Sequence, residues 1–366
     1  MKIGIDASRA FWKERTGTEE YSYQLLRHLA KLEGVSRHEI LMYVKEGARI
    51  DFELPSNFIL REVRGNFLWT RLRLSAELRK HPVDVLFVPA HALPSFAPAR
   101  SVVTVHGLEH KRCPDCYSWK DRLSLEANAL LSILPAARII APSESTKEDI
   151  IRCYKAAPER VSVIYHGAAP KSRAAAEGAA DKRRFEILFI GRLEKRKNVA
   201  RMVRAFGKFR KNIGDAGGGK KIRLVLAGKD GFGSGEIRKE ISRSEYGGDI
   251  MAEGYISEEE KEKSYENADV FLFPSLSEGF GLPILEAMGR GVPVITSRAS
   301  ALAEVAGSAA MLVDPADEEA IAAALEKLFR NEGAREELAR KGYENARKFS
   351  WDRCAEETWK VLTEWE

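Results

Sequence analysis

The stretch FPSLSEGFGLPILEAMGRGVPV, residues 273–294, predicts the end of a strand, a tight loop, a short helix and the start of another strand. An apolar run from Val270 to Phe273 is followed by the pair Pro274-Ser275. Gly279 and Gly281 favour a turn, and Pro283 suits the first turn of a helix. Because a glycine loop that leads into a helix start presents backbone N–H groups, this stretch predicts an anion site.

Two carboxylates belong to the same stretch. Glu278 lies in the loop and Glu286 in the following helix. Backbone N–H groups could bind a phosphate while the two acids accept hydrogen bonds from sugar hydroxyls. The pattern therefore indicates a nucleotide-sugar site, and the alternative is an ordinary strand-to-helix turn with solvated acids.

A basic loop, GRLEKRKN at residues 191–198, follows the apolar run from Phe185 to Ile190. Arg192 can clamp two phosphate oxygens and Lys197 adds a point charge, so both suit a diphosphate leaving group that gains charge as its bond to the sugar breaks. We expect Lys195 and Arg196 to be surface residues. The alternative interpretation is a solvated run of charges.

Together the two motifs resemble the E-x7-E and donor-diphosphate motifs of the retaining glycosyltransferases of family 4, which have the two-domain GT-B fold. The resemblance is strongest to bacterial mannosyltransferases and rhamnosyltransferases of surface polysaccharide assembly. It implies a hexose donor such as GDP-mannose, a saccharide or lipid-linked acceptor, retention of anomeric configuration by front-face attack, and neither a cofactor nor an obligatory metal. Nothing in the spacing itself shows that mechanism.

The resemblance also implies a role for individual residues. It makes Arg192, Lys197, Glu278 and His106 the catalytic set, with His106 at the donor sugar, and it makes Glu286 the acid that binds the ribose hydroxyls. The implied donor-binding backbone groups are those of Gly17, Gly191, Phe280, Gly281, Leu282 and Tyr255.

The fold class that we predict is α/β, with two doubly wound Rossmann-like domains that face each other across a cleft, as in the resembled fold. Apolar runs alternate with helical patterns in both halves, which is typical of parallel sheets covered on both faces. We place the acceptor-side domain at residues 1–168, a linker rich in Ala, Gly, Lys and Arg at 169–184, and the donor domain at 185–349. The resemblance implies that a last helix, 350–366, crosses back to the N-terminal domain.

The first loop argues against a nicotinamide enzyme, because G-x-G-x-x-G does not follow the strand KIGID at residues 2–6. The resembled family has a glycine pair here. This chain has Thr16-Gly17-Thr18, so Gly17 is the candidate and we expect Thr18 to cap the helix. His106 follows the apolar run VVTV, at a strand end where ligands of parallel sheets collect. A buried structural histidine is the alternative.

Composition favours a cytoplasmic globular protein. The chain has 366 residues, 44% of them hydrophobic and 31% charged, and no apolar run approaches the ~20 residues of a membrane span. The net charge of +5 falls on the first part of the chain, with 25 Lys and Arg against 20 Asp and Glu from Met1 to His166 and 34 of each afterwards. That excess could meet an anionic lipid or a phosphorylated acceptor, and no motif supports nucleic acid.

Residues 66–80, NFLWTRLRLSAELRK, combine apolar and basic residues at helical spacing. An ordinary surface helix packed on the sheet explains the pattern well. Peripheral attachment to an anionic membrane on its inner face is the sharper hypothesis.

The cysteines predict no metal site. Cys113 and Cys116 form one C-x-x-C, and no second pair completes a zinc site, although His91, His106 and His110 could be recruited in space. We interpret the pair as reduced thiols in a loop.

Three other functions stay open or are disfavoured at this point. A retaining glycosidase also needs two carboxylates, about 5 Å apart, but would have no use for the basic loop. A sugar-nucleotide 2-epimerase shares the two-domain fold, and a non-catalytic subunit of that fold would not need all four charged residues.

Overall fold

The computed structural model spans residues 1–366 and describes all of them except 13–14, 66–67, 91, 172–182 and 215–218. The chain forms two compact units. Unit 1 contains residues 1–108, 119–167 and 349–366, and unit 2 contains residues 109–118 and 168–348. Most of the expected linker, residues 172–182, lies outside the described part, and so does His91.

Unit 1 is built on a parallel sheet of seven strands in the order β3-β2-β1-β4-β5-β6-β7. Its central strands are almost continuously apolar because both faces of the sheet are buried. The strands are β1 (Lys2–Asp6), β2 (Glu39–Lys45), β3 (Phe58–Val63), β4 (Val85–Val88), β5 (Ser101–Thr104), β6 (Arg138–Ala141) and β7 (Val161–Val163).

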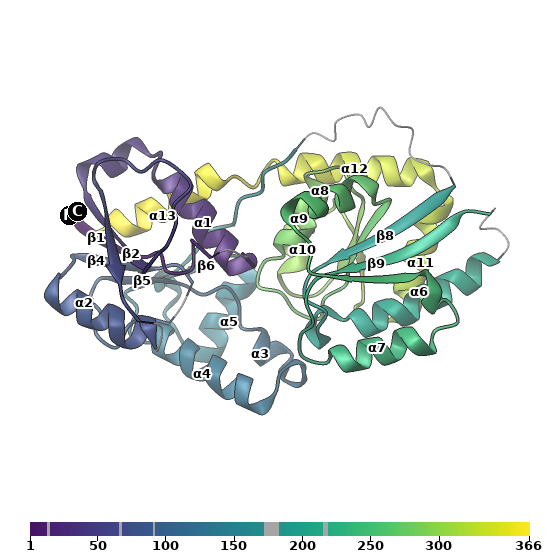
Figure 1. Ribbon diagram of the computed structural model, residues 1–366, viewed down its shortest axis with the longest axis horizontal. Coiled ribbons are helices and arrows are strands. Elements are labelled where there is room, and N and C mark those ends of the chain that lie inside the picture. The colour runs from purple at the N-terminus through teal and green to yellow at the C-terminus, as the bar shows by residue number, and fades with distance from the viewer. Residues whose placement is uncertain (13–14, 66–67, 91, 172–182, 215–218) are drawn as a thin grey trace. The chain divides into compact units, whose positions relative to one another are not determined.

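The helices of unit 1 connect these strands and close the core. They are α1 (Gly17–Leu29), η1 (Glu33–Arg37), η2 (Trp69–Leu74), α2 (Ser75–Lys80), α4 (Trp119–Ile133), α5 (Glu144–Tyr154), η4 (Pro158–Arg160) and the last helix, α13 (Trp351–Thr363). Helix α13 packs against α1, and Figure 1 shows the two side by side. The end of the chain therefore belongs to the unit in which the chain begins.

Two local expectations about unit 1 are wrong. The N-cap of α1 is Thr16, not Thr18, because Thr16 forms a capping box in which its own backbone N–H donates to the Glu19 carboxylate. In the expected helix 66–80, the described residues 68–80 do not form one regular α-helix. After Leu68, which has a left-handed backbone, a π-helical turn runs from Trp69 to Leu74 and only Ser75–Lys80 is α-helical.

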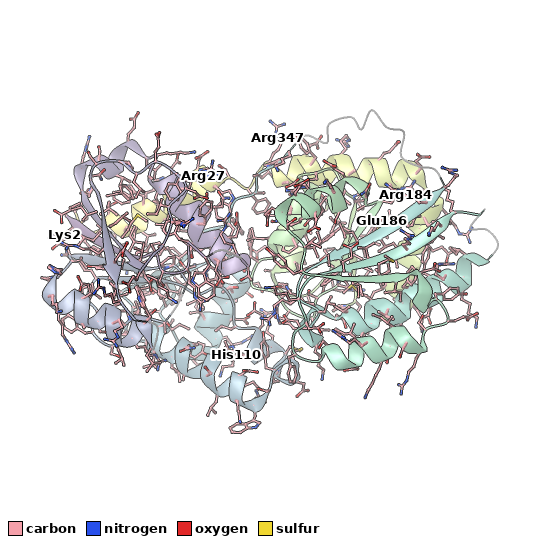
Figure 2. The ribbon with its side chains drawn as sticks, viewed as in Figure 1. Lys2, Arg27, His110, Arg184, Glu186 and Arg347 are labelled. Atoms are coloured by element: carbon pink, nitrogen blue, oxygen red, sulfur yellow. A yellow bond between two sulfur atoms is a disulfide. The ribbon has the colours of Figure 1, made fainter. Side chains whose placement is uncertain are left out.

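Unit 2 contains a second parallel sheet, of six strands, in the order β10-β9-β8-β11-β12-β13. The strands are β8 (Arg184–Ile190), β9 (Lys221–Ala227), β10 (Ile250–Gly254), β11 (Val270–Phe273), β12 (Val294–Ser297) and β13 (Met311–Val313). Arg184 and Glu186, which Figure 2 labels, are the first and third residues of β8.

The helices of unit 2 lie on both sides of this sheet (Figure 1). Helix α6 packs with α7 and α11, while α9 packs with α10 and α12. The helices are α3 (Glu109–Arg112), η3 (Pro114–Cys116), η5 (Lys195–Lys197), α6 (Val199–Ile213), α7 (Ser234–Arg243), η7 (Gly247–Asp249), α8 (Glu258–Asn267), α9 (Leu282–Met288), α10 (Ser300–Ala306), α11 (Glu318–Arg330) and α12 (Glu332–Ala346).

The strand order of unit 2 determines where a ligand can bind. From β8 the chain runs outward through β9 to β10 and then crosses back to β11 on the other side of β8, so the direction of the sheet switches between β8 and β11. A sheet of this kind binds ligands at the carboxyl ends of the strands beside such a switch point. The loop 191–198 follows β8 and the loop 274–281 follows β11, so both predicted motifs lie at that edge.

The cysteine interpretation is also wrong. Cys113 and Cys116 form a disulfide that closes the short segment between α3 and α4. Within the described residues, no group of three His, Cys, Asp or Glu side chains could hold a metal ion. The same part of the chain contains no helix that is both long and apolar enough to cross a membrane.

Candidate functional site: the loops after β8 and β11

Lys197 and Glu278, which are 81 positions apart in the sequence, form a close ion pair. Lys197 Nζ donates to Glu278 Oε1 at 2.6 Å, and the two side chains are only 11% and 10% exposed. The contact joins the loop after β8 to the loop after β11. The structure thus brings together one residue from each predicted motif.

Asn198 fixes the geometry of that junction. Its backbone is left-handed, with φ of 64°, and it ends the 3-10 turn of η5 just before α6. Its side-chain amide donates to the carbonyl of Pro274 at 3.0 Å and to that of Pro315 at 2.6 Å. Asparagine tolerates this conformation better than most residues, so it can turn the chain and tie the two loops together.

Glu278 is held in its ionised form. Burial alone would raise the pKa of its carboxyl group, but Arg196 and Lys197 lower it to about 2. Burial lowers the pKa of the Lys197 ammonium, against the opposing effect of Glu278. The site therefore contains a permanently charged carboxylate and a partly desolvated lysine at neutral pH.

Arg196 is not the surface residue that we expected. Its side chain is 15% exposed, and Nη1 lies 2.8 Å from Glu278 Oε2. Its other contacts, to the carboxylate of Glu194 and to the carbonyl of Ser277, are both shorter than 3 Å. Arg192 and Lys195 are exposed, so among the four cations of this loop only Arg196 and Lys197 face Glu278.

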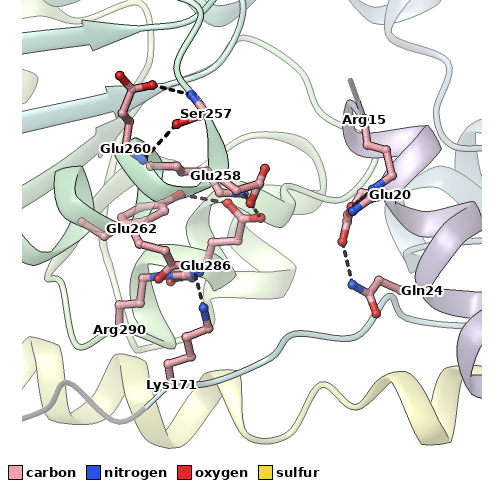
Figure 3. Close-up of polar contacts among 12 residues, drawn as sticks. Arg15, Glu20, Gln24, Lys171, Ser257, Glu258, Glu260, Glu262, Glu286 and Arg290 are labelled. Atoms are coloured by element: carbon pink, nitrogen blue, oxygen red, sulfur yellow. Dashed lines mark hydrogen bonds and ion pairs between the residues drawn. The ribbon is translucent and has the colours of Figure 1, made fainter. Parts of the chain in front are cut away.

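Glu286 lies in a separate polar cluster on α9. Tyr265 Oη donates to Glu286 Oε2 at 3.0 Å, and Lys261 Nζ lies 3.3 Å from Oε1. Figure 3 shows Arg290 beside this acid, bonded to Glu262, which also pairs with Lys171. The Glu286 side chain is 27% exposed, and both of its carboxylate oxygens accept hydrogen bonds, from Tyr265 and Lys261, which orients the carboxylate.

The glycine loop itself is tightly constrained. Gly281 caps α9 with φ of 104°, and a Cβ atom there would lie 2.6 Å from Leu302 Cδ2. Phe280 is buried, and Leu282 is the first residue of α9. The Glu278 N–H donates to Ser300 Oγ at 3.0 Å.

A second segment of unit 2 reaches the same loop. The N–H of Gly279 donates to Glu109 Oε1 at 3.0 Å. Tyr117 lies close enough to Glu109, Arg196, Glu194 and Glu278 to be affected by their charges, and burial raises the pKa of its hydroxyl above the usual range. Residues 109–118, which contain the Cys113–Cys116 disulfide, thus contribute to the surroundings of Glu278.

The remaining candidates in unit 2 lie around β8 to β10. Gly191 directly follows β8 and lies close to Gly228. A Cβ atom added at Gly228 would lie only 2.0 Å from the carbonyl oxygen of Gly191, so the two would collide. Tyr255, which follows β10, is 54% exposed, and the Lys229 ammonium lies 4.8 Å from its ring centre. Tyr255 is not part of the Glu278 or Glu286 cluster.

His106 and Gly17 belong to unit 1. His106 Nε2 is 2.7 Å from the carbonyl of Pro89, so Nε2 carries the proton and donates. Burial lowers the pKa of His106 to about 4, and the ring of Tyr21 contacts it edge-on. A neutral imidazole is therefore fixed beyond the end of β5. Gly17 is the exposed first residue of α1.

Several residues of the site carried no sequence signal that singled them out. Arg196 is one of three consecutive cations, Lys261 lies in a highly charged helix, and Glu109 comes from a distant segment. Asn198 is different, because asparagine is a common residue at the start of a helix. Its place between a basic turn and an amphipathic helix could have singled it out.

Models of known families match both parts of the chain. Residues 15–171 match the model described as Glycosyltransferase Family 4, and residues 171–349 match that of Glycosyl transferases group 1. The O-antigen chain mannosyltransferase B of Escherichia coli is 30% identical over 268 residues, which is 71% of this chain and 69% of that protein. The chain belongs to glycosyltransferase family 4. It is a glycosyltransferase.

Two further similarities fit the family 4 assignment. An uncharacterised glycosyltransferase of Methanocaldococcus jannaschii is 28% identical over 70% of this chain and 67% of its own length. Among solved structures, sucrose-phosphate synthase of Thermosynechococcus elongatus superimposes with a TM-score of 0.75 at 19% identity, covering 99% of this chain and 98% of that one.

A second solved structure shows the same fold. Alr3699/HepE of Anabaena, solved in complex with UDP and glucose, has a TM-score of 0.72 and 16% identity, and each chain is covered completely. The two Rossmann-like units of this family 4 enzyme are those of the GT-B fold.

Proposed function

We propose that this glycosyltransferase moves a hexose, with mannose as the first choice, from a nucleoside-diphosphate sugar to a saccharide or lipid-linked acceptor. The pathway would be the synthesis of a cell-surface polysaccharide or glycan. The reaction would retain the anomeric configuration and need no divalent metal. The observation that carries this proposal is the Lys197–Glu278 ion pair at the carboxyl ends of β8 and β11.

The chemistry of the pair suits donor activation. Transfer breaks the bond between the anomeric carbon and a diphosphate oxygen, and negative charge grows on the departing phosphate. Lys197, with Arg192, would stabilise that charge, so a bound cation would not be required. Glu278, together with the backbone N–H groups of Phe280, Gly281 and Leu282, would hold the sugar.

The rest of the donor would lie along the same sheet edge. Glu286 has an oriented carboxylate that suits the two ribose hydroxyls, and the backbone near Tyr255 would face the nucleobase. The acceptor oxygen would bond to the anomeric carbon as the phosphate leaves, and the leaving phosphate would take the proton of the acceptor hydroxyl. His106, whose Nε2–H already donates to Pro89, would accept a hydrogen bond from a sugar hydroxyl through Nδ1.

Two comparisons support the choice of donor. The Escherichia coli relative and a Mycolicibacterium hassiacum relative that is 30% identical are both named mannosyltransferases. The Anabaena structure contains UDP and glucose, so the fold accommodates a nucleoside diphosphate beside a hexose. The sugar and the base are therefore best identified by testing a panel of nucleotide-sugar donors.

The decisive test is the release of nucleoside diphosphate from GDP-mannose, UDP-glucose, UDP-N-acetylglucosamine and dTDP-rhamnose. We expect slow turnover of one donor, unaffected by EDTA and lost in Glu286→Ala. Glu266→Ala, which changes an exposed acid on α8, is the matched control. No turnover and no binding of any donor would contradict the proposal. Conversion of the donor to an epimer without an acceptor would instead identify a 2-epimerase.

Peripheral contact with an anionic membrane remains part of the proposal. In the described part of residues 66–80, Leu68 and Leu72 are about half exposed next to the exposed Arg73. Cosedimentation with vesicles that contain phosphatidylglycerol should show salt-sensitive binding, weakened in Leu72→Ser. Leu60→Ser, at a similarly exposed leucine on the edge strand β3, is the control. Equal binding to neutral vesicles, or none, would contradict the membrane contact.

A further inference from the structure

Arg196 connects the two loops of the donor site more extensively than Lys197 does. Its guanidinium contacts the Glu278 carboxylate at 2.8 Å, the Ser277 carbonyl at 2.9 Å and the Glu194 carboxylate at 2.8 Å. Its own carbonyl accepts a hydrogen bond from the N–H of Leu276 at 2.9 Å. Both the backbone and the side chain of Arg196 are therefore fixed to the loop after β11.

The two oxygens of Glu278 have different partners. Lys197 binds Oε1 and Arg196 binds Oε2. Under the proposed function, Lys197 must also bind the donor diphosphate. A single ammonium on a flexible stem cannot fully satisfy a carboxylate and a diphosphate at once, whereas a planar guanidinium with three fixed contacts can stay where it is.

We propose that Arg196 is a positioning residue that remains with Glu278 as its counter-ion while Lys197 turns to the donor diphosphate. Arg196 would keep the carboxylate charged and aimed at the sugar through the whole reaction. Glu194, on the other side of the guanidinium, would hold Arg196 in place. This inference rests on the proposed function, since it assigns Arg196 to the same site.

The charges around Glu278 are consistent with these separate roles of Arg196 and Lys197. Arg196 and Lys197 act on Glu278 directly, and Arg196 in turn interacts with Glu194, Glu109 and Tyr117. These groups come from the loop after β8, its turn η5 and the segment 109–118. Two of these groups are cations and two are acids, so the loss of one cation by movement of Lys197 would leave Glu278 among other negative charges. Arg196 is the cation that prevents this.

A direct test is the titration of the Glu278 carboxyl group by NMR, with 13C-labelled glutamate. The Glu278 resonance is identified by its absence in Glu278→Gln. In the wild type we expect Glu278 to stay ionised through the acid range in which the protein is folded, with and without GDP or UDP. In Arg196→Met its pKa should rise by about one unit or more, and should rise further when the nucleotide binds.

Two variants keep the test independent of any damage to folding. Arg196→Lys retains a charge but cannot span Glu194, Ser277 and Glu278 together. Glu194→Gln leaves Arg196 in place and removes only the acid that holds it. Lys195→Met, an exposed cation in the same turn, is the matched control and should titrate like the wild type. An unchanged Glu278 titration in folded Arg196→Met would overturn the proposal.

Kinetics with the active donor supply the second readout. Misaiming of Glu278 in Arg196→Lys should lower kcat by about tenfold to a hundredfold, with a smaller change in KM and an acid limb shifted to higher pH. Loss of donor affinity alone, with kcat and the pH profile unchanged, would contradict a positioning role. If the wild type turned over no donor, the proposed function would fail, while the titration would still decide the role of Arg196.

Discussion

Glu278 is the residue on which the electrostatics of the loops after β8 and β11 depend. Its carboxyl group has a folded-state pKa of about 2, below the ordinary value of 4.5, because Arg196 and Lys197 outweigh its burial. A carboxyl group with a lowered pKa stabilises the folded state above its unfolded-state pKa. That contribution is lost as the pH falls from about 4.5 towards 2.

The first prediction follows from this ion pairing. Glu278→Gln should destabilise the protein at pH 7 by about 3 kcal/mol, because it leaves two largely buried cations without their acid. The difference from the wild type should shrink as the pH falls below 4.5. Urea unfolding at pH 7 and pH 4 measures both effects. Glu266→Gln, at an exposed acid, should change the free energy of unfolding by no more than about 0.5 kcal/mol.

His106 gives a prediction of the same kind for unit 1. Its folded-state pKa of about 4 lies below the ordinary value of 6.5, so the unfolded chain binds the proton more readily. The folded state should therefore lose stability as the pH falls from 6.5 to 4. His106→Gln should flatten that dependence in urea unfolding, and His81→Gln, at an exposed histidine, should not. An unchanged slope in His106→Gln would contradict the burial of a neutral ring.

At this scale the sequence pattern singles out the acids more clearly than the bases. Glu278 and Glu286 are isolated acids in a stretch, residues 273–289, of otherwise uncharged residues, so the pattern predicts a function for each. Arg196 and Lys195 are neighbours of the same type. Which of them faces Glu278 depends on the 3-10 turn from Lys195 to Lys197 and on the left-handed Asn198, and neither is encoded in the charge pattern.

At the scale of elements, the strands were predictable because buried parallel strands are short, nearly continuous apolar runs. The apolar runs KIGID at 2–6, VVTV before His106, 185–190 and 270–273 all overlap strands, which are β1, β5, β8 and β11. Helix α12 was not anticipated, since it buries only small residues such as Gly342 and Ala346 and has no apolar stripe. The helix over residues 66–80 was expected to be regular, but the left-handed Leu68 and a π-helical turn interrupt it.

The start of α9 yields a prediction about one element. Gly281→Ala should destabilise the protein by about 1–3 kcal/mol, because alanine is strained at a φ of 104° and its Cβ would lie 2.6 Å from Leu302 Cδ2. Gly235→Ala is the matched control, since it lies in α7 with no atom within 4 Å of the added Cβ and should be neutral or slightly stabilising. Thermal unfolding compares the two. Equal stability of both variants would show that the loop can relax.

At the scale of the whole molecule, the chain is organised as two units that each have a parallel sheet, with the final helix returned to the first unit. The fold class follows from the alternation of apolar runs with helical patterns along the sequence. The division of the chain does not follow as simply. Residues 109–118, which sequence reasoning placed inside the N-terminal domain, belong by their contacts to unit 2, and Glu109 bonds to the loop of Glu278.

The measurement that tests the central claim most directly is calorimetric titration of GDP and of UDP into the wild type, Lys197→Ala, Glu286→Ala and Lys195→Ala. The account predicts that one nucleotide binds per chain. Binding should be about tenfold or more weaker in Lys197→Ala and Glu286→Ala, because each loses one charged contact, and unchanged in Lys195→Ala. Failure of the wild type to bind either nucleotide, or equal binding by all four proteins, would contradict a donor site at the loops after β8 and β11.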